Sequence, residues 1–352
     1  MESVMNRQTA ATLNYIWINL TSKCNHRCRY CYDSGHVNAE ITLEVYRKIL
    51  SLVKDANLKG VIFIGGEPTL HSRFLDLQRL CTDTIIPPVI ITNGSRFIDA
   101  DFCEAVVRNG VSRVLFSVLG PNAELQDQVT LRNGSFDRVI RGVETLKKHT
   151  PVSRIGTITT ITSVNRHHLT RVIDLGINLG LRQTIFNLCT PSIVATKTGM
   201  ALSPKEYAEA IQEVYVYAKA RNHAIEIGTN AAKCIFDEEL SAEMIAKKVI
   251  RTGPCQLYRG TGVQFLSDGS ITPCTHVYDQ ILGNPIEMGL SLDEFVDWLN
   301  TGTPRQFRDN MWRYPTESCK ECSKWGECTG GCPLMWSIHD PHIYLHQIPT
   351  SN

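Results

Sequence analysis

The chain has 352 residues, of which 43% are hydrophobic and 20% are charged, and its formal net charge is +1. This length can bury one large core and a smaller satellite domain, and the balanced charge argues against nucleic acid or an anionic membrane surface as a partner. No apolar run approaches the roughly 18 residues of a membrane span, and the N-terminal sequence lacks the apolar stretch of a signal peptide. We therefore expect a soluble, cytoplasmic protein.

Short β-branched runs alternate with amphipathic helical patterns along the first two-thirds of the chain. This alternation predicts βαβ units with right-handed crossovers and a parallel sheet, and the apolar runs VIFI and VIIT indicate a sheet covered on both faces. Six units fall short of the eight that close a TIM barrel. We therefore expect an α/β fold, a partial (β/α)6 TIM-like barrel with ligands at the carboxyl ends of its strands. The predicted strands are 15–20, 61–64, 89–92, 114–118, 155–162 and 183–188.

The last third of the chain has a different character. A helix is predicted to begin at Ser203-Pro204, which form a good N-cap and first-turn pair. The pair Asp268-Gly269 predicts a hairpin turn, and cysteines are frequent from there to residue 332. The predicted organisation is an N-terminal tail (1–12), the barrel (13–230), a helical connector (231–250) and a cysteine-rich domain (251–352).

The chain contains 13 cysteines, three of them in Cys24-Asn-His-Arg-Cys28-Arg-Tyr-Cys31 directly after the first predicted strand. In a chain of this size so many cysteines indicate metal rather than a disulfide scaffold. Three can hold an iron–sulfur cube but leave one iron open, and an open position distinguishes catalytic from structural metal sites. Half of a zinc ribbon that uses His26 is the alternative, although no second ligand pair follows within 40 residues.

A second motif, Gly65-Gly66-Glu67-Pro68, directly follows the second predicted strand. The glycines allow the backbone to approach a ligand closely, and Glu67 would point into the barrel mouth, where a carboxylate can hold an ammonium group. Alone, this sequence is also that of an ordinary turn. One βα unit after the CxxxCxxC motif, however, it closely resembles the radical S-adenosylmethionine (radical SAM) superfamily, and the resemblance covers roughly residues 13–230.

The resemblance implies that Cys24, Cys28 and Cys31 hold a [4Fe–4S] cluster whose open iron is chelated by S-adenosylmethionine (SAM). One electron, from a flavodoxin- or ferredoxin-type reductant, would then cleave SAM to a 5′-deoxyadenosyl radical that abstracts a substrate hydrogen. The protein would orient the cofactor and exclude water. The residues that the resemblance places around SAM are Tyr30 near the adenine, Glu67 at the ammonium, Ser117 and Arg132 at the carboxylate or ribose, and Gly65, Gly66 and Pro68 of the second motif.

A second cysteine group consists of Cys255-x13-Gly269-x4-Cys274 followed by Cys319-x2-Cys322-x5-Cys328-x3-Cys332. This pattern resembles the SPASM domain of radical SAM enzymes, which binds two auxiliary [4Fe–4S] clusters. The resemblance implies that one cluster is held by Cys255, Cys274 and Cys332 and the other by Cys319, Cys322 and Cys328. A four-cysteine zinc site within 319–332 is the alternative.

The usual SPASM pattern has a seventh cysteine, and none follows Cys332. The outer cluster would then need a ligand such as histidine, and the cluster next to the barrel also lacks a fourth cysteine, so we expect one or two auxiliary clusters. The candidate ligands in the tail are His339, Asp340, His342 and His346, of which His346 lies nearest to the expected separation.

Three residues are candidates for substrate chemistry. Relatives that oxidise a sulfatase side chain use an aspartate just after the hairpin cysteine as base, but here that residue is Thr275. His276 or Asp279 would have to act as the base, so sulfatase maturation is disfavoured. Cys189, at the end of the sixth predicted strand, is placed to face a substrate.

Three functions stay open. The first is a radical SAM oxidoreductase or maturase that oxidises, cross-links or epimerises a peptide side chain, with auxiliary clusters as electron acceptors. A separate protein would deliver the peptide, because Cys24 lies too near the start for a leader-binding domain. The second is a dehydrogenase or decarboxylase of a small natural-product or sugar-derived substrate, and the third is a non-catalytic metal-binding protein.

Overall fold

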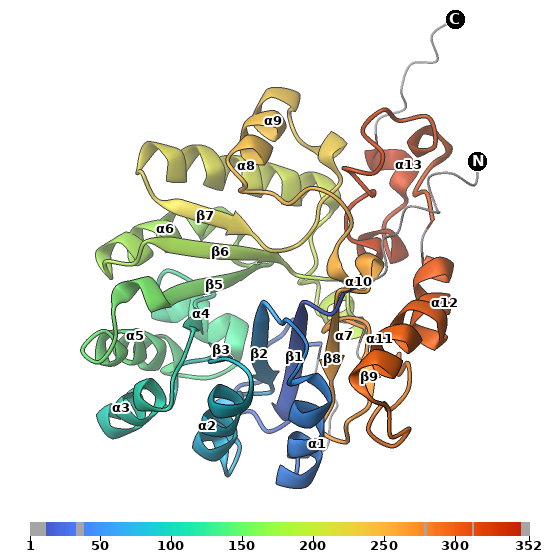
Figure 1. The fold of residues 1–352 in the computed structure, drawn as a ribbon. Coiled ribbons are helices and arrows are strands. Elements are labelled where there is room, and N and C mark those ends of the chain that lie inside the picture. The colour runs from blue at the N-terminus through green and yellow to red at the C-terminus, as the bar shows by residue number, and fades with distance from the viewer. Residues whose placement is uncertain (1–11, 33–38, 278–279, 312, 346–352) are drawn as a thin grey trace, which may run out of the picture.

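The computed structural model describes residues 12–32, 39–277, 280–311 and 313–345. Its centre is a nine-stranded sheet with the order β7-β6-β5-β4-β3-β2-β1-β8-β9 (Figure 1). Neighbouring strands are parallel from β7 through β8, and only β9 runs antiparallel to its neighbour. The strands are β1 (Tyr15–Thr21), β2 (Gly60–Gly65), β3 (Val89–Thr92), β4 (Arg113–Ser117), β5 (Ile155–Ile161), β6 (Gln183–Leu188), β7 (Ala224–Ile227), β8 (Gly262–Phe265) and β9 (Ile271–Thr272).

The prediction of an α/β partial barrel is confirmed, and the six predicted strands coincide with β1 to β6. The predicted hairpin is also present, since β8 pairs with β9 around Gly269, whose φ of 89° suits glycine. The sequence analysis missed β7, because its four residues, AIEI, include an exposed alanine and a glutamate. It also did not foresee that β8 would pair with β1 and so extend the barrel sheet.

Helices cover the outer face of the sheet (Figure 1). Thr42 caps α1 by accepting a hydrogen bond from the Val45 N–H, and Ser203, as predicted, caps α8, where it forms a capping box with Glu206. The helices are α1 (Leu43–Val53), α2 (Phe74–Thr84), α3 (Ala100–Arg108), α4 (Ala123–Thr130), α5 (Ser135–Leu146), α6 (Leu169–Asn178), α7 (Ile193–Lys197), α8 (Pro204–Ala220), α9 (Glu238–Ala246), α10 (Gln256–Arg259), α11 (Leu292–Thr301), α12 (Thr303–Met311) and α13 (Pro341–Tyr344).

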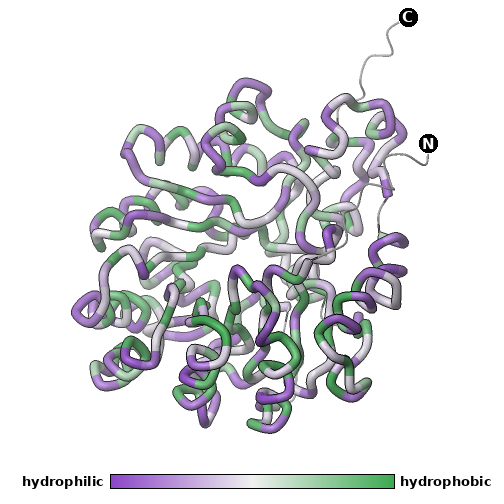
Figure 2. Tube along the Cα trace, in the orientation of Figure 1, coloured by the Kyte–Doolittle hydropathy of each residue, from purple (hydrophilic) through white to green (hydrophobic). Residues whose placement is uncertain are grey.

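The hydrophobic core lies between the sheet and the helices that cover it, and hydrophobic residues recur along both the strands and the helices (Figure 2). Its largest cluster joins Phe63 and Phe116 of the barrel to Phe265 and Phe295 of the C-terminal part. The cysteine-rich part therefore shares both a sheet and a core with the barrel. No helix in the described ranges is long and apolar enough to cross a membrane.

Candidate active site

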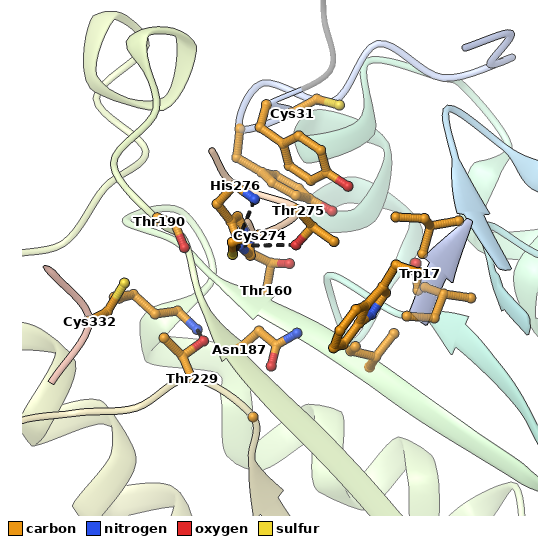
Figure 3. A pocket seen from close by; sticks show the side chains of 18 of the residues that line it. Trp17, Cys31, Thr160, Asn187, Thr190, Thr229, Cys274, Thr275, His276 and Cys332 are labelled. Atoms are coloured by element: carbon orange, nitrogen blue, oxygen red, sulfur yellow. Dashed lines mark hydrogen bonds between the residues drawn. The ribbon is translucent and has the colours of Figure 1, made fainter. Parts of the chain in front are cut away.

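A cavity of about 1330 Å³ lies inside the open barrel. Its wall includes the three cysteines of the first motif together with Cys255, Cys274 and Cys332 of the second group. Cys31, Cys274 and Cys332 are labelled in Figure 3. Pockets for a single small ligand usually measure about 300–1,000 Å³, so this cavity has room for a cofactor and a substrate together. The two cysteine groups, far apart in the sequence, meet at this cavity.

The cysteine loop after β1 is held by the residues that follow β2. The Gly66 N–H donates to the Thr21 carbonyl (2.7 Å), and the Glu67 N–H donates to the Lys23 carbonyl (2.8 Å). A Cβ on Gly66 would lie 2.6 Å from the Lys23 carbonyl oxygen. Glycine is required because backbone meets backbone here. The second motif, whose two glycines also line the cavity, thus fixes the segment that leads into Cys24.

Three further segments hold the same loop. The Asn93 side-chain amide, just after β3, donates to Oδ1 of Asn25 (2.7 Å). The N–H groups of Arg27 and Arg29 each donate to a carbonyl at the end of α4 (3.0 Å), and the Thr198 hydroxyl donates to the Arg29 carbonyl (2.7 Å). The loop therefore has a defined path, although it contains no helix or strand.

Glu67 is buried next to this loop and is only 1% exposed. Its Oε1 accepts hydrogen bonds from the hydroxyls of Thr69 (2.6 Å) and Thr92 (2.7 Å), and its Oε2 accepts one from the Asn93 N–H (2.6 Å). Burial raises the pKa of this carboxyl, while the hydrogen bonds oppose the rise. The side chain joins the ends of β2 and β3 and also borders the cavity.

The first cysteine group fits an iron–sulfur cluster in its donor chemistry. Burial strongly raises the pKa of the Cys28 thiol, and the neighbouring Cys31 and Cys24 raise it further. These three thiols are therefore close enough for their charges to interact. Metal ligands must be thiolates, and a bound metal is what stabilises several thiolates in a buried place.

The second group shows the same proximity. Cys255 precedes α10, Cys274 follows β9, and Cys332 begins the turn at residues 333–337. Burial raises the pKa of Cys274 to about 11 and that of Cys332 to about 12, and the charge of Cys255 contributes to both. Three thiols from distant segments thus lie together on the cavity wall, as ligands of one cluster must.

Among the residues that the structure describes, no three His, Cys, Asp or Glu side chains are arranged to hold a metal ion. A single ion requires all its donor atoms within about 2.0–2.3 Å of one point. The thiolates of a four-iron cluster bind separate irons, so they lie farther from one another than the ligands of a zinc ion.

Residues 18–176 match the family model described as the radical SAM superfamily. These residues form a radical SAM domain. Such a domain supports an enzyme rather than a non-catalytic metal-binding protein, and it implies a [4Fe–4S] cluster and SAM as cofactors.

Three relatives of this chain are named AdoMet-dependent heme synthase. The protein from Nitratidesulfovibrio vulgaris is 25% identical over 337 residues, which cover 91% of this chain and 87% of the relative. The protein from Oleidesulfovibrio alaskensis is 26% identical over 57% of this chain and 52% of its own length.

Two solved structures share the fold. Streptococcus suis SuiB bound to S-adenosylmethionine has a TM-score of 0.72 at 17% identity, covering 98% of this chain and 79% of its own. The structure of anSMEcpe with AdoMet and Cp18Cys peptide has a TM-score of 0.68 at 24% identity, and the match covers 91% of this chain and 89% of the anSMEcpe chain. The shared fold therefore includes the cysteine-rich C-terminal part as well as the radical SAM barrel.

The outer cysteines of this radical SAM enzyme are carried on tight turns. The Trp325 N–H donates to the Cys322 carbonyl (2.9 Å), and the Cys328 N–H donates to the Lys324 carbonyl (2.8 Å). The Lys233 N–H, from the segment after β7, donates to the Cys328 thiol (3.4 Å). These turns leave the cysteine side chains partly exposed.

Two of the tail residues predicted as ligands for an outer cluster, His339 and Asp340, have other partners. Nε2 of His339 lies 3.1 Å from the Leu202 carbonyl oxygen. Asp340 caps α13 by accepting a hydrogen bond from the His342 N–H. His346 lies outside the described residues.

The residues predicted to contact SAM divide into two groups. Tyr30 and Ser117 line the cavity with Gly65, Gly66 and Glu67. Pro68 is buried in the 3-10 turn that Glu67 caps. Arg132 is exposed. Burial is the largest cause of the lowered pKa of His26, about 4, and the positive charge of Arg132 is the next largest. The structure does not bring Pro68 or Arg132 to the cavity wall.

The candidates for substrate chemistry are placed differently from one another. His276 lines the cavity, its ring lies 5.2 Å from that of Tyr32, and burial lowers its pKa to about 4. Cys189 is only 1% exposed, packs with Ala195 and Met200, and is not among the cavity residues, so the expectation that it faces a substrate is not supported. Asp279 lies outside the described residues.

Several cavity residues escaped the sequence analysis. Trp17 of β1, Thr160 of β5 and Asn187 of β6 point into the barrel (Figure 3). The burial of β1 alternates, with Tyr15, Trp17 and Asn19 less buried than their neighbours. Successive side chains of a strand point to opposite faces of the sheet, so the alternation in β1 could have identified the residues of this inner face. The sequence analysis treated residues 15–20 only as a barrel strand.

Proposed function

We propose that this radical SAM enzyme oxidises or cross-links a side chain of a peptide and passes an electron to an auxiliary cluster beside the substrate. The observation that carries the proposal is that Cys28 and Cys31 line the same cavity as Cys255, Cys274 and Cys332. A peptide is supported by the fold, since SuiB has been solved with the precursor peptide SuiA and anSMEcpe with the Cp18Cys peptide.

The first cysteine group would hold the [4Fe–4S] cluster, which with SAM supplies a radical able to take a hydrogen atom from the substrate. Three cysteines leave the fourth position open for SAM. The buried side chain of Glu67 and the partly buried side chain of Tyr30 would restrict access of water to this region. The hydrogen bonds from Asn93 and Thr198 hold the loop in one path, which orients the cofactor.

A two-electron oxidation removes a hydrogen atom, an electron and a proton from the substrate. Cys255, Cys274 and Cys332 would hold the cluster that accepts the electron. His276 is the described candidate for receiving the proton, because it lies on the cavity wall next to Cys274. A separate flavodoxin- or ferredoxin-type reductant and a peptide-delivery protein belong to the same proposal.

The test begins with iron and acid-labile sulfide after anaerobic reconstitution of the wild type and of a Cys24→Ala/Cys28→Ala/Cys31→Ala variant. The wild type should form 5′-deoxyadenosine from SAM with a chemical reductant, and the variant should not. The variant should retain about four irons for one auxiliary cluster or about eight for two. A variant that holds zinc and no iron would refute the auxiliary clusters.

A second candidate is the dehydrogenation or decarboxylation of a small molecule. Two observations favour it: the cavity wall carries several basic side chains, and a relative named heme synthase aligns with 91% of the chain. The two candidates are separated by supplying a short peptide encoded beside the gene. Loss of two hydrogens from that peptide, measured by mass spectrometry, supports the first, while SAM cleavage without any change in the peptide supports the second.

A further inference from the structure

The wall of the cavity is strongly basic. Glu67 is the sole acidic residue among its described lining residues, and both of its carboxylate oxygens already accept hydrogen bonds from the protein. The basic residues on the same wall number six: Arg27, Arg29, Lys59, Lys248, Arg251 and Arg259.

The open seam of the sheet lies between the edge strand β7 and the β8-β9 end (Figure 1). Four of these cations come from segments near this seam. Lys59 precedes β2, and its N–H donates to the Asn14 carbonyl (2.7 Å) at the start of β1. Arg259 ends α10, just before β8. Lys248 and Arg251 lie on the segment that follows α9 and runs beside β7, where Arg251 pairs with Glu226.

Lys59, Lys248, Arg251 and Arg259 line the cavity and are also exposed. The cavity must therefore reach solvent at this seam, and we name these four residues the basic opening. One N–H group of Arg251 binds Glu226 (2.6 Å), and one of Arg259 binds the Thr252 carbonyl (3.3 Å). A guanidinium has five N–H donors, so both arginines keep donors for a ligand.

Another part of the cavity wall carries uncharged side chains. Trp17 lies there with Thr160, Asn187 and Thr229 (Figure 3). The indole ring lies so close to Gly262 that a Cβ at that residue would be 2.8 Å from it. A molecule that spans this region meets an aromatic face and neutral hydrogen-bonding groups, and it meets charge at the opening.

We propose that the basic opening binds an anionic group of the substrate, a carboxylate or a phosphate, while the uncharged part of the substrate extends past Trp17 toward the cysteines. Arginine donors suit both anions, and the lysines add positive charge at the point of entry. This inference names the chemical class of the substrate and rests on the proposed radical reaction.

The test uses the full chain with its clusters and SAM bound, and it measures the binding of triglutamate and of inorganic tripolyphosphate by calorimetry. We expect at least one probe to bind, and the Lys59→Gln/Lys248→Gln variant to bind it about tenfold more weakly. Binding of triglutamate alone indicates a carboxylate substrate, and binding of tripolyphosphate alone indicates a phosphorylated one.

The matched control is Lys54→Gln/Lys247→Gln, which removes the same charge from the same region. Neither lysine lines the cavity, and Lys247 pairs with Glu243. This control should bind the probe within twofold of the wild type. If both double variants bind the probe equally more weakly, the effect is due to net charge alone and the proposal is overturned. The absence of probe binding by the wild type would also overturn it. Weakening by Arg27→Gln alone would also overturn it, because the anion would then lie at the cysteine loop.

Failure of this inference is distinguishable from failure of the proposed function, because binding does not depend on the radical reaction. A chain that binds the anion but does not cleave SAM refutes the proposed function alone. A chain that cleaves SAM and binds neither probe refutes the basic opening alone.

Discussion

The Asn93 side-chain amide donates a 2.7 Å hydrogen bond to Oδ1 of Asn25, and the Asn93 backbone N–H donates a 2.6 Å hydrogen bond to Glu67. One residue at the end of β3 thus holds both the cysteine loop and the motif after β2. The amide of Asn25 continues the chain of contacts by donating to the Ser95 hydroxyl (2.9 Å). The shape of the cofactor loop depends on this small polar network.

Replacing Asn93 by alanine should therefore impair loading of the first cluster more than it impairs folding. The variant leaves the Asn25 amide oxygen without this donor, at a cost of about 1–2 kcal/mol in the free energy of unfolding. Iron content and SAM cleavage should fall several-fold. The control is Asn109→Ala, which removes one hydrogen bond to the Leu75 carbonyl; it should lose similar stability and keep its iron. Equal iron loss in both variants would contradict the prediction.

Gly66→Ala should displace the loop by steric conflict. The added Cβ would lie 2.6 Å from the Lys23 carbonyl oxygen, and neither backbone segment can yield without breaking the hydrogen bonds between them. We expect a loss of about 1–3 kcal/mol in the free energy of unfolding together with reduced iron loading. For comparison, a Cβ on Gly176 would be 3.3 Å from its nearest neighbour, so Gly176→Ala should cost clearly less in chemical denaturation.

Glu40 should make stability depend on pH in the acid range. Burial alone would raise the pKa of this carboxyl, but hydrogen bonds from Ser72 and from Lys23 outweigh burial and lower the pKa to about 2. A folded-state pKa below the unfolded value gives stability that is present above about pH 4.5 and is lost as the pH falls toward 2.

The measurement is the difference in unfolding free energy between the wild type and Glu40→Gln. At pH 7 we expect about 1–2 kcal/mol, after allowing for solvent screening, and a smaller difference at each step below pH 4.5. Glu44→Gln is the control, because Glu44 pairs with Lys48 on an exposed helix surface. A difference for Glu40→Gln that stays constant from pH 7 to pH 3 would show that the ion pair does not act as described.

Thr92→Val should weaken the site without changing its shape. The hydroxyl of Thr92 donates to Oε1 of Glu67 (2.7 Å) and accepts from the Gly94 N–H (3.0 Å). Removing it leaves buried polar groups with fewer partners, which costs about 1–3 kcal/mol in the free energy of unfolding. Thr82→Val provides the comparison, because that hydroxyl bonds to backbone carbonyls away from the cavity. If the affinity for SAM falls in Thr92→Val but not in Thr82→Val, Glu67 contributes to binding of the cofactor.

The sequence was sufficient for the barrel because each of β1 to β6 is a compact apolar run whose period is visible locally. It was also sufficient to group the cysteines, whose spacing is a local property of the chain. It did not predict that β8 would join β1, because strand pairing across more than 240 residues leaves no local signal. The basic opening was missed for the same reason, since Lys59 and Lys248 line one cavity only through the closure of the fold.

The pairing of β1 with both β2 and β8 also bears on how this protein is made. During synthesis Tyr15 to Ile18 lack their second partner strand until Gly262 to Phe265 have emerged from the ribosome. Contacts of such long sequence separation form slowly, and an unpaired strand edge is prone to aggregation in the meantime. A nascent chain of this enzyme should therefore depend on chaperones until its C-terminal third is complete, and a version truncated before residue 262 should be insoluble.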